Sequence, residues 1–261
     1  LVDLDAEDAE QHDRDLEQDL HALLETVSAA AREAGTALVL FIDELQYVPE
    51  DQLAALISAL HLCAQRQLPI TLIGAGLPQL RGQTGRAKSY AERLFEFPEV
   101  GPLDEPAASW AIAKPIRDQG AAIEPDAVQR IVAETRGYPY FLQEWGKHTW
   151  DAAEGAPITK AAVERASLTA IAALDASFFR VRLDRLTPLE RRYLRAMAEL
   201  GPGPHRSGDI ATCLGRVVTA LAPTRNKLIA KGMIWSPAHG DTAFTVPLFD
   251  EFMVRSVPGD D

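Results

Sequence analysis

Two short apolar runs, at residues 38–42 (LVLFI) and 70–74 (ITLIG), are the clearest pattern along the chain. Apolar runs of this length without alternation are typical of strands buried on both faces of a parallel sheet. Each run follows a segment with apolar residues at helical spacing, 16–34 and 50–63. The order helix, strand, helix, strand predicts a parallel βαβ arrangement.

Two carboxylates follow the first predicted strand directly. Asp43 and Glu44 come after Ile42, at the carboxyl end of the strand. Ligands of open α/β sheets bind outside this end. An acidic pair there can hold Mg²⁺ and can polarise a nucleophilic water. The alternative is a strand that ends in a polar turn without chemical function.

Residues 38–46 as a whole resemble the Walker B motif of P-loop ATPases, in the Asp-Glu-x-Gln form found among AAA+ and STAND-type members. The resemblance implies that Asp43 helps to position Mg²⁺ and that Glu44 activates the attacking water. The phosphate-binding pattern G-x-x-x-x-G-K-[ST] does not occur in the sequence. We therefore expect a C-terminal portion of a longer protein, which binds ATP and Mg²⁺ when intact, whereas this chain alone binds neither.

Two further positions follow from the same resemblance. The second strand ends in glycine and alanine, where AAA+ proteins usually carry a polar "sensor 1" side chain, so that this group is absent or is supplied by Thr71 or the backbone. Arg93 matches an arginine that such proteins carry just before the last strand, here expected at 95–98, and an arginine fork can stabilise phosphoryl charge. The alternative for Arg93 is a pairing with the helix dipole or with Glu92.

Residues 103–165 have an all-helical pattern, in which Asp104 is a predicted helix cap. Gly137 and Pro139 resemble the Gly-x-Pro motif that STAND and archaeal-type ATPases carry in their helical lid, and the resemblance places Pro139 near the nucleotide. Gly137 can end one helix and Pro139 can open the next. The alternative is a corner between two helices without a ligand.

The last third predicts three helices and a hairpin, which is the order of a winged helix. Thr187 and Glu190 form a predicted capping box at the first of these helices. The third helix, expected near 223–231 with Pro223 in its first turn, carries Arg225 and Lys227 as candidate DNA contacts. Residues 187–261 hold nine Lys/Arg and eight Asp/Glu, which is a weak electrostatic footprint for DNA. A role in protein interaction or internal packing is therefore the favoured alternative.

Charge and cysteine content change the picture little. Residues 1–50 contain fourteen Asp/Glu and two Lys/Arg, which accounts for the net charge of −12. The rest of the chain is neutral overall, so this acidity does not argue against nucleic acid as a partner of the C-terminal part. No apolar run is long enough to span a membrane. Cys63 and Cys213 are far apart in helical contexts, which fits buried thiols and a cytoplasmic protein.

The expected fold class is therefore a partial α/β P-loop ATPase sheet (residues 1–102), followed by an all-α lid (103–165) and a C-terminal winged helix (166–261). The expected function is ATP binding and hydrolysis coupled to a winged-helix output domain. The alternative is a non-catalytic regulator that binds DNA or a protein through the winged helix. Candidate partners are ATP, a DNA or protein target, and a second copy of the chain.

Overall fold

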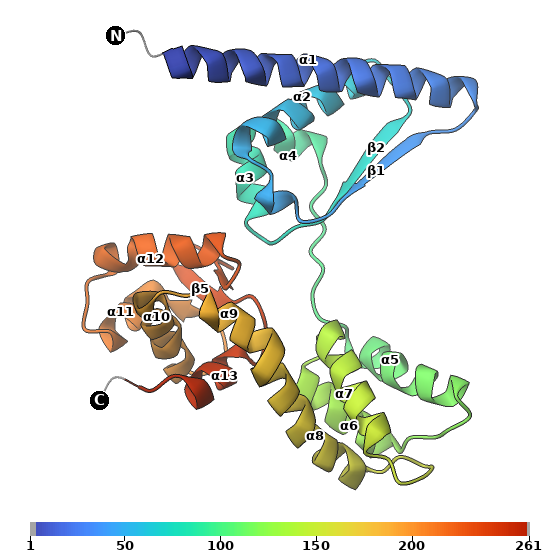
Figure 1. The fold of residues 1–261 in the computed structure, drawn as a ribbon, viewed down its shortest axis with the longest axis vertical. Coiled ribbons are helices and arrows are strands. Elements are labelled where there is room, and N and C mark those ends of the chain that lie inside the picture. Colours follow the sequence, from blue (N-terminus) through green and yellow to red (C-terminus); the bar gives the residue numbers. More distant parts are fainter. Residues whose placement is uncertain (1–3, 260–261) are drawn as a thin grey trace. The chain divides into compact units, whose positions relative to one another are not determined.

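The structure is a computed structural model that describes residues 4–259, with side chains from residue 16 onward. The chain folds as two compact units, Leu1–Glu99 and Val100–Asp261. Both are mostly helical, and the first contains a small parallel sheet (Figure 1). None of the helices in this described part combines the length and apolar character that a membrane span requires.

The first unit places helices around one sheet. Its elements are α1 (Leu4–Glu33), β1 (Leu38–Ile42), the 3₁₀ turn η1 (Leu45–Tyr47), α2 (Glu50–Gln65), β2 (Ile70–Gly74), α3 (Leu80–Ala87) and α4 (Ala91–Leu94). Pro49 precedes α2, and Glu50 and Asp51 occupy its first turn. Carboxylates are favourable there because the amino end of a helix carries partial positive charge.

The two predicted strands pair in parallel, as the sequence pattern indicated. Leu38 lies opposite Ile70, and the register continues to Ile42 opposite Gly74. Residues 95–98, where the last strand was expected, leave α4 without forming a strand or joining a sheet, and this separation agrees with the expected partial sheet. A strand needs a hydrogen-bonding neighbour, and in the part of the chain described here the sheet contains β1 and β2 alone.

The sheet is covered on one face only. The inward side chains of Leu38, Leu40, Ile70 and Leu72 pack against a cluster that includes Leu24, Ala59, Leu60 and Cys63 of helices α1 and α2. On the other face Val39, Phe41 and Ile73 are 44%, 75% and 51% exposed. The expectation that β1 is buried on both faces was therefore wrong within this unit, because both covering helices lie on the same side.

The second unit contains helices and one small antiparallel sheet. Its elements are α5 (Glu105–Asp118), α6 (Pro125–Thr135), α7 (Pro139–Asp151), α8 (Lys160–Leu174), the π-helical turn η2 (Asp175–Phe179), α9 (Arg180–Asp184), α10 (Pro188–Glu199), β3 (His205–Arg206), α11 (Ser207–Cys213), α12 (Val218–Ala230), β4 (Ile234–Trp235), β5 (Asp241–Phe244) and α13 (Phe249–Ser256). The strand order is β3-β5-β4.

Two predicted helix caps are confirmed in this unit. The Asp104 carboxylate accepts a hydrogen bond from the backbone N–H of Ala107 at 2.9 Å and so caps α5. Thr187 and Glu190 form the capping box of α10, in which each side chain accepts from the backbone N–H of the other residue. These bonds satisfy donors that the first turn of a helix leaves unpaired.

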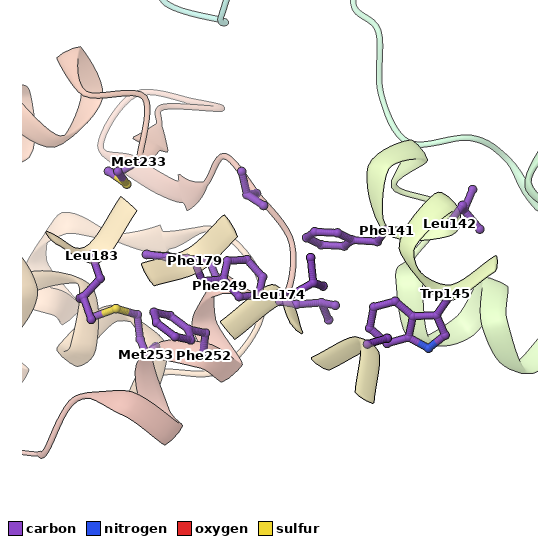
Figure 2. Packing of buried hydrophobic residues seen from close by; sticks show 14 of the residues in the cluster. Phe141, Leu142, Trp145, Leu174, Phe179, Leu183, Met233, Phe249, Phe252 and Met253 are labelled. Atoms are coloured by element: carbon purple, nitrogen blue, oxygen red, sulfur yellow. The ribbon is translucent and has the colours of Figure 1, made fainter. Parts of the chain in front are cut away.

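One apolar core runs through the whole second unit. In Figure 2, Phe141 and Trp145 of α7 lie on one side of Leu174, and Phe179 and Phe252 lie on the other. The rings of Phe141 and Phe179 are 5.8 Å apart, and those of Phe179 and Phe252 are 5.2 Å apart. The expected domain boundary between residues 165 and 166 falls inside α8, so the helical part and the C-terminal part share this core.

The C-terminal part contains the predicted three helices, α10 to α12, followed by the β4–β5 hairpin. The start of α12 differs from the prediction. It begins at Val218, which puts Pro223 in the helix interior instead of the first turn. Pro223 is exposed to solvent. A proline has no N–H to donate to the carbonyl four residues earlier, and water can bond that carbonyl instead.

A buried ion pair ties α10 to the turn after α12. The Lys231 ammonium lies 2.8 Å from the Glu190 carboxylate, whose side chain is 3% exposed. Burial alone would raise the pKa of Glu190. The hydrogen bonds from Lys231 and from Thr187 outweigh burial and hold the pKa below the ordinary value of 4.5.

This pair predicts a pH-dependent loss of stability. Lys231→Met should lower the free energy of unfolding at neutral pH by about 2 kcal/mol, because it leaves a buried carboxylate without its charged donor. The folded state binds the Glu190 proton more weakly than the unfolded state. The ionised Glu190 therefore contributes its full share of the free energy of unfolding above pH 4.5, and this contribution is lost as the pH falls further. Urea unfolding should show the difference from the parent shrinking in acid, whereas Lys227→Met, at an exposed position of α12, should match the parent throughout.

Candidate functional site

The carboxyl end of the parallel sheet carries the predicted acidic pair. Asp43 and Glu44 are exposed and follow β1 directly. The Asp43 carboxylate accepts a hydrogen bond from the Glu44 backbone N–H at 2.8 Å. The backbone of Glu44 has φ 55° and ψ 36°, the left-handed conformation that residues other than glycine rarely adopt. Such backbone persists only where its surroundings enforce it, and it is concentrated at functional sites.

The loop after β2 enforces this conformation. Backbone hydrogen bonds run from Ala75 N–H to the Ile42 carbonyl (2.9 Å) and from Leu45 N–H to the Ala75 carbonyl (3.0 Å). They bracket Asp43 and Glu44 and bind the acidic turn to the neighbouring strand. The backbone is thus fixed both before Asp43 and after Glu44 by hydrogen bonds to Ala75.

Gln46 connects the acidic turn to the loop after β2 through its side chain. Its Nε2 donates to the Glu44 carboxylate, and its Oε1 accepts from the Leu77 backbone N–H at 3.0 Å. The Gln46 carbonyl accepts from Gln83 Nε2 at 3.2 Å. Gln46 is only 7% exposed. Sequence reasoning missed this residue, although it is the last letter of the Asp-Glu-x-Gln pattern.

The last residue of β2, Gly74, and Gly76 in the loop after it leave room for these contacts. A Cβ atom on Gly74 would lie 2.3 Å from Leu45 Cδ1, and one on Gly76 would lie 2.7 Å from Gln46 Oε1. The glycines at the predicted sensor-1 position therefore allow close approach. Thr71, the suggested substitute, lies opposite Val39 near the start of β2 and not at its carboxyl end.

The donor set fits a magnesium ion held together with a phosphate ligand. Mg²⁺ is usually bound by one or two protein carboxylates, with water and phosphate oxygens as the other ligands. Asp43 and Glu44 supply two adjacent carboxylates, and one Asp43 oxygen is free of the bond to Glu44 N–H. The described residues contain no cluster of three or more His, Cys, Asp or Glu that could hold a metal. Additional ligands would have to come from a nucleotide and water.

Arg93 lies on α4 and is exposed. Among the described residues, its side chain makes no hydrogen bond or ion pair with the acidic pair, with Glu92 or with any other group. Neither the expected phosphate-facing role nor the alternative pairing with Glu92 is therefore visible in its contacts.

Gly137 and Pro139 form a corner between α6 and α7 in the second unit. Gly137 has φ +70°, and a Cβ there would lie 2.3 Å from the Leu103 carbonyl oxygen. The Leu103 N–H donates to the Gly137 carbonyl at 2.9 Å. Pro139 opens α7 in the first position, as predicted. Close packing against Leu103 explains why a glycine is required here.

The residue before this corner is charged and is tied to α13. Arg136, also left-handed at φ 54°, lies 2.8 Å from the Glu251 carboxylate and 4.0 Å from that of Asp250. A cavity of about 260 Å³ lies next to it, lined by Trp145, Glu251 and Arg255 among others. Ionic contacts therefore connect the Gly-x-Pro corner with the C-terminal helix.

The two candidate DNA contacts on α12 differ in their surroundings. The Arg225 guanidinium donates to the Thr242 hydroxyl (3.0 Å), the Ser236 hydroxyl (2.9 Å) and the Asp241 carbonyl (2.9 Å). These bonds hold the Arg225 side chain against the β4–β5 hairpin, which agrees better with the favoured alternative of internal packing than with a DNA contact. Lys227 is exposed. Helical periodicity alone could not show that the hairpin would lie on the Arg225 side.

Comparisons with known proteins bear mainly on the fold. A family model described as a domain of unknown function (DUF8462) matches residues 176–253. Among curated proteins, none matches the chain. The Walker-type ATPase of Pyrococcus abyssi is 16% identical, with a TM-score of 0.61 over 87% of this chain and 65% of the archaeal chain. The chain has a P-loop ATPase-like fold.

A variant of RuvB from Thermotoga maritima is also similar, at 20% identity over 93% of this chain and 76% of that one, with a TM-score of 0.48. A structure of the same protein described as the Holliday junction branch migration motor has a TM-score of 0.43. The fold assignment rests on the archaeal ATPase, because its TM-score is the higher one. The mostly helical architecture with a small parallel sheet agrees with it.

Proposed function

We propose that this chain is a portion of an AAA+/STAND-type ATPase that couples ATP binding and hydrolysis to a C-terminal output domain of the winged-helix type. The observation that carries the proposal is the acidic turn after β1. It presents two carboxylates at the ligand-binding end of a parallel sheet, with Glu44 in an enforced left-handed conformation, in a P-loop ATPase-like fold.

In this function Asp43 and Glu44 have separate roles. Asp43, with a free carboxylate oxygen, helps to hold Mg²⁺, and Glu44 accepts a proton from the water that attacks the γ-phosphate. A bound Mg²⁺ would neutralise part of the negative charge of the phosphates. Arg93, Gly137 and Pro139 are proposed contacts of the nucleotide.

The exposed sheet face supports the proposal that further protein packs on the first unit. Parallel sheets are normally covered on both faces. Here Val39, Phe41 and Ile73 form an apolar surface, and each of β1 and β2 has one edge without a partner in the described part of the chain. A strand that carries the phosphate-binding loop would pair with one of these edges and complete the site, and the protein that follows it would cover the apolar face.

The output role rests on the C-terminal part. Three helices, α10 to α12, precede the β4–β5 hairpin, and β3 adds a third strand. This order and pairing support the proposal of a winged helix, in which the third helix would be the contact element. Here that element is α12.

The surface of α12 favours a protein partner over DNA. Val217 and Val218 at its start are 67% and 45% exposed, and Ala222 and Pro223 are exposed on the same helix. Arg225 is bonded to the hairpin, and Arg206 next to it is paired with Asp241 at 3.1 Å. DNA binding relies on free cations that contact phosphates. Protein recognition is therefore the second part of the proposal.

A gel-shift experiment distinguishes the two kinds of partner. The chain should give no shift with duplex DNA at 0.1 M salt, and Lys227→Glu should not change this result. Lys160→Glu, an exposed lysine of α8, is the matched control. A salt-sensitive shift that Lys227→Glu abolishes and Lys160→Glu preserves would identify α12 as a DNA reader. The experiment that tests the ATPase proposal itself is Mg²⁺-dependent phosphate release from ATP by the full-length protein.

A further inference from the structure

We propose that Gln46 is the positioning residue for the Glu44 carboxylate and couples it to the loop after β2. This inference rests on the proposed ATPase function and assigns a role that the fold alone does not give. Gln46 is buried between two exposed segments, and its side chain contacts one group on each of them. It would thus hold the catalytic carboxylate in the direction of the attacking water.

The orientation of the Gln46 amide follows from its two partners. A backbone N–H can only donate, so the atom that meets Leu77 N–H is the amide oxygen. An ionised carboxylate can only accept, so the atom that meets Glu44 is the amide nitrogen. Both contacts are satisfied by one amide orientation, and flipping the amide would lose both. The bond from Leu77 N–H to the amide oxygen therefore leaves the amide nitrogen of Gln46 directed at Glu44.

Glu44 needs such a partner because, within the described part of the chain, no other side chain or backbone group holds its carboxylate. The side chain is exposed and has three rotatable bonds, while a general base must lie within hydrogen-bond reach of the proton it removes. Among the described residues, Gln46 is the hydrogen-bond partner of the Glu44 carboxylate. Holding a reacting group in place removes conformational entropy before the reaction and so accelerates it.

The loop after β2 is shaped to receive Gln46. A Cβ on Gly76 would lie 2.7 Å from Gln46 Oε1 and 2.9 Å from Leu80 Cδ2, so that a side chain at this position would displace the Gln46 amide or Leu80. The Gln83 amide holds the Gln46 backbone carbonyl from α3. Any movement of the 76–77 segment would therefore be transmitted to Glu44 through one buried amide. β2 ends in glycine and alanine at the sensor-1 position, and Gln46 supplies a polar link there.

Two substitutions separate the two hydrogen bonds. Gln46→Glu keeps an acceptor for Leu77 N–H but replaces the donor to Glu44 by a like charge. Gln46→Leu loses both bonds. In the full-length protein, both variants should lower kcat by about tenfold or more with little change in KM, since a hydrogen bond to a charged group is lost. Gln52→Glu and Gln52→Leu, at an exposed position of α2, are the matched controls and should leave kcat unchanged.

A second readout needs neither nucleotide nor activity. In the ligand-free chain, one Gln46 side-chain amide proton should be shifted downfield in the NMR spectrum, and Glu44→Ala should return it to the value of a free amide. The Leu77 backbone amide should exchange slowly with solvent in the parent and in Gln46→Glu, and quickly in Gln46→Leu. A Gln46 amide signal that is indifferent to Glu44→Ala would overturn the inference.

The outcomes separate this inference from the function on which it rests. If the full-length protein hydrolyses ATP, Glu44→Gln is inactive and Gln46→Glu turns over at the parent rate, the positioning role of Gln46 is refuted while the ATPase proposal stands. If the protein shows no hydrolysis, the ATPase proposal fails, and the NMR contact alone decides whether Gln46 holds Glu44. A fall in kcat with Gln46→Glu, at retained Leu77 protection, supports both.

Discussion

Glu44→Gln in the full-length protein should lower the rate of ATP hydrolysis by about 100-fold or more, while the dissociation constant for Mg-ATP stays close to that of the parent. The amide keeps the size of the carboxylate but cannot take a proton from water. Because a base acts only in the transition state, kcat and kcat/KM should fall together. Phosphate release gives the rate, and calorimetric titration gives the dissociation constant.

The matched control is Glu96→Gln, at an exposed glutamate of the same unit outside the acidic turn. It should hydrolyse ATP at the parent rate. Unchanged turnover in Glu44→Gln would remove Glu44 from the mechanism. The acidic turn would then have to be interpreted as the polar end of a strand.

Gly137→Ala should lower the free energy of unfolding of the second unit by about 3 kcal/mol. Two effects add at this position. The backbone has φ +70°, which is unfavourable for any residue with a Cβ, and that Cβ would lie 2.3 Å from the Leu103 carbonyl oxygen. The segment at 103 would have to move away from the corner. Urea unfolding followed by circular dichroism measures the loss.

Gly120 provides a control for the backbone effect alone. It has φ +74°, similar to Gly137, but a Cβ there would meet no atom within 4 Å. Gly120→Ala should therefore cost only about 1 kcal/mol, the strain of a left-handed alanine. Equal losses at the two positions would contradict the close approach between Gly137 and Leu103.

The strand pairing could be predicted from sequence, and the covering of the sheet could not. Apolar runs at 38–42 and 70–74, each after a helical segment, suffice to predict two parallel strands. The same runs suggested burial on both faces, yet Phe41 is 75% exposed. A run of apolar residues shows that a strand avoids water but does not show which segment covers it.

In the candidate site too, some features could be predicted from sequence and others depend on tertiary contacts. Asp43 and Glu44 are placed by sequence alone, because they directly follow a predicted strand. The left-handed backbone of Glu44 and the link through Gln46 depend on a loop about 30 positions later, and no local pattern shows that contact. For a related reason, the sequence left open whether Arg225 contacts DNA or packs internally. Its partners Thr242 and Ser236 lie on the hairpin, whose side of α12 is set by tertiary packing.

The central claim is that the acidic turn after β1 belongs to an ATP-hydrolysing site, and steady-state phosphate release tests it most directly. The full-length protein is incubated with ATP in the presence of Mg²⁺ and then with Mg²⁺ removed by chelation. Phosphate release should require Mg²⁺ and should be lost in Glu44→Gln. No release from the folded full-length protein with Mg-ATP, at any protein or salt concentration that keeps it soluble, would contradict the account.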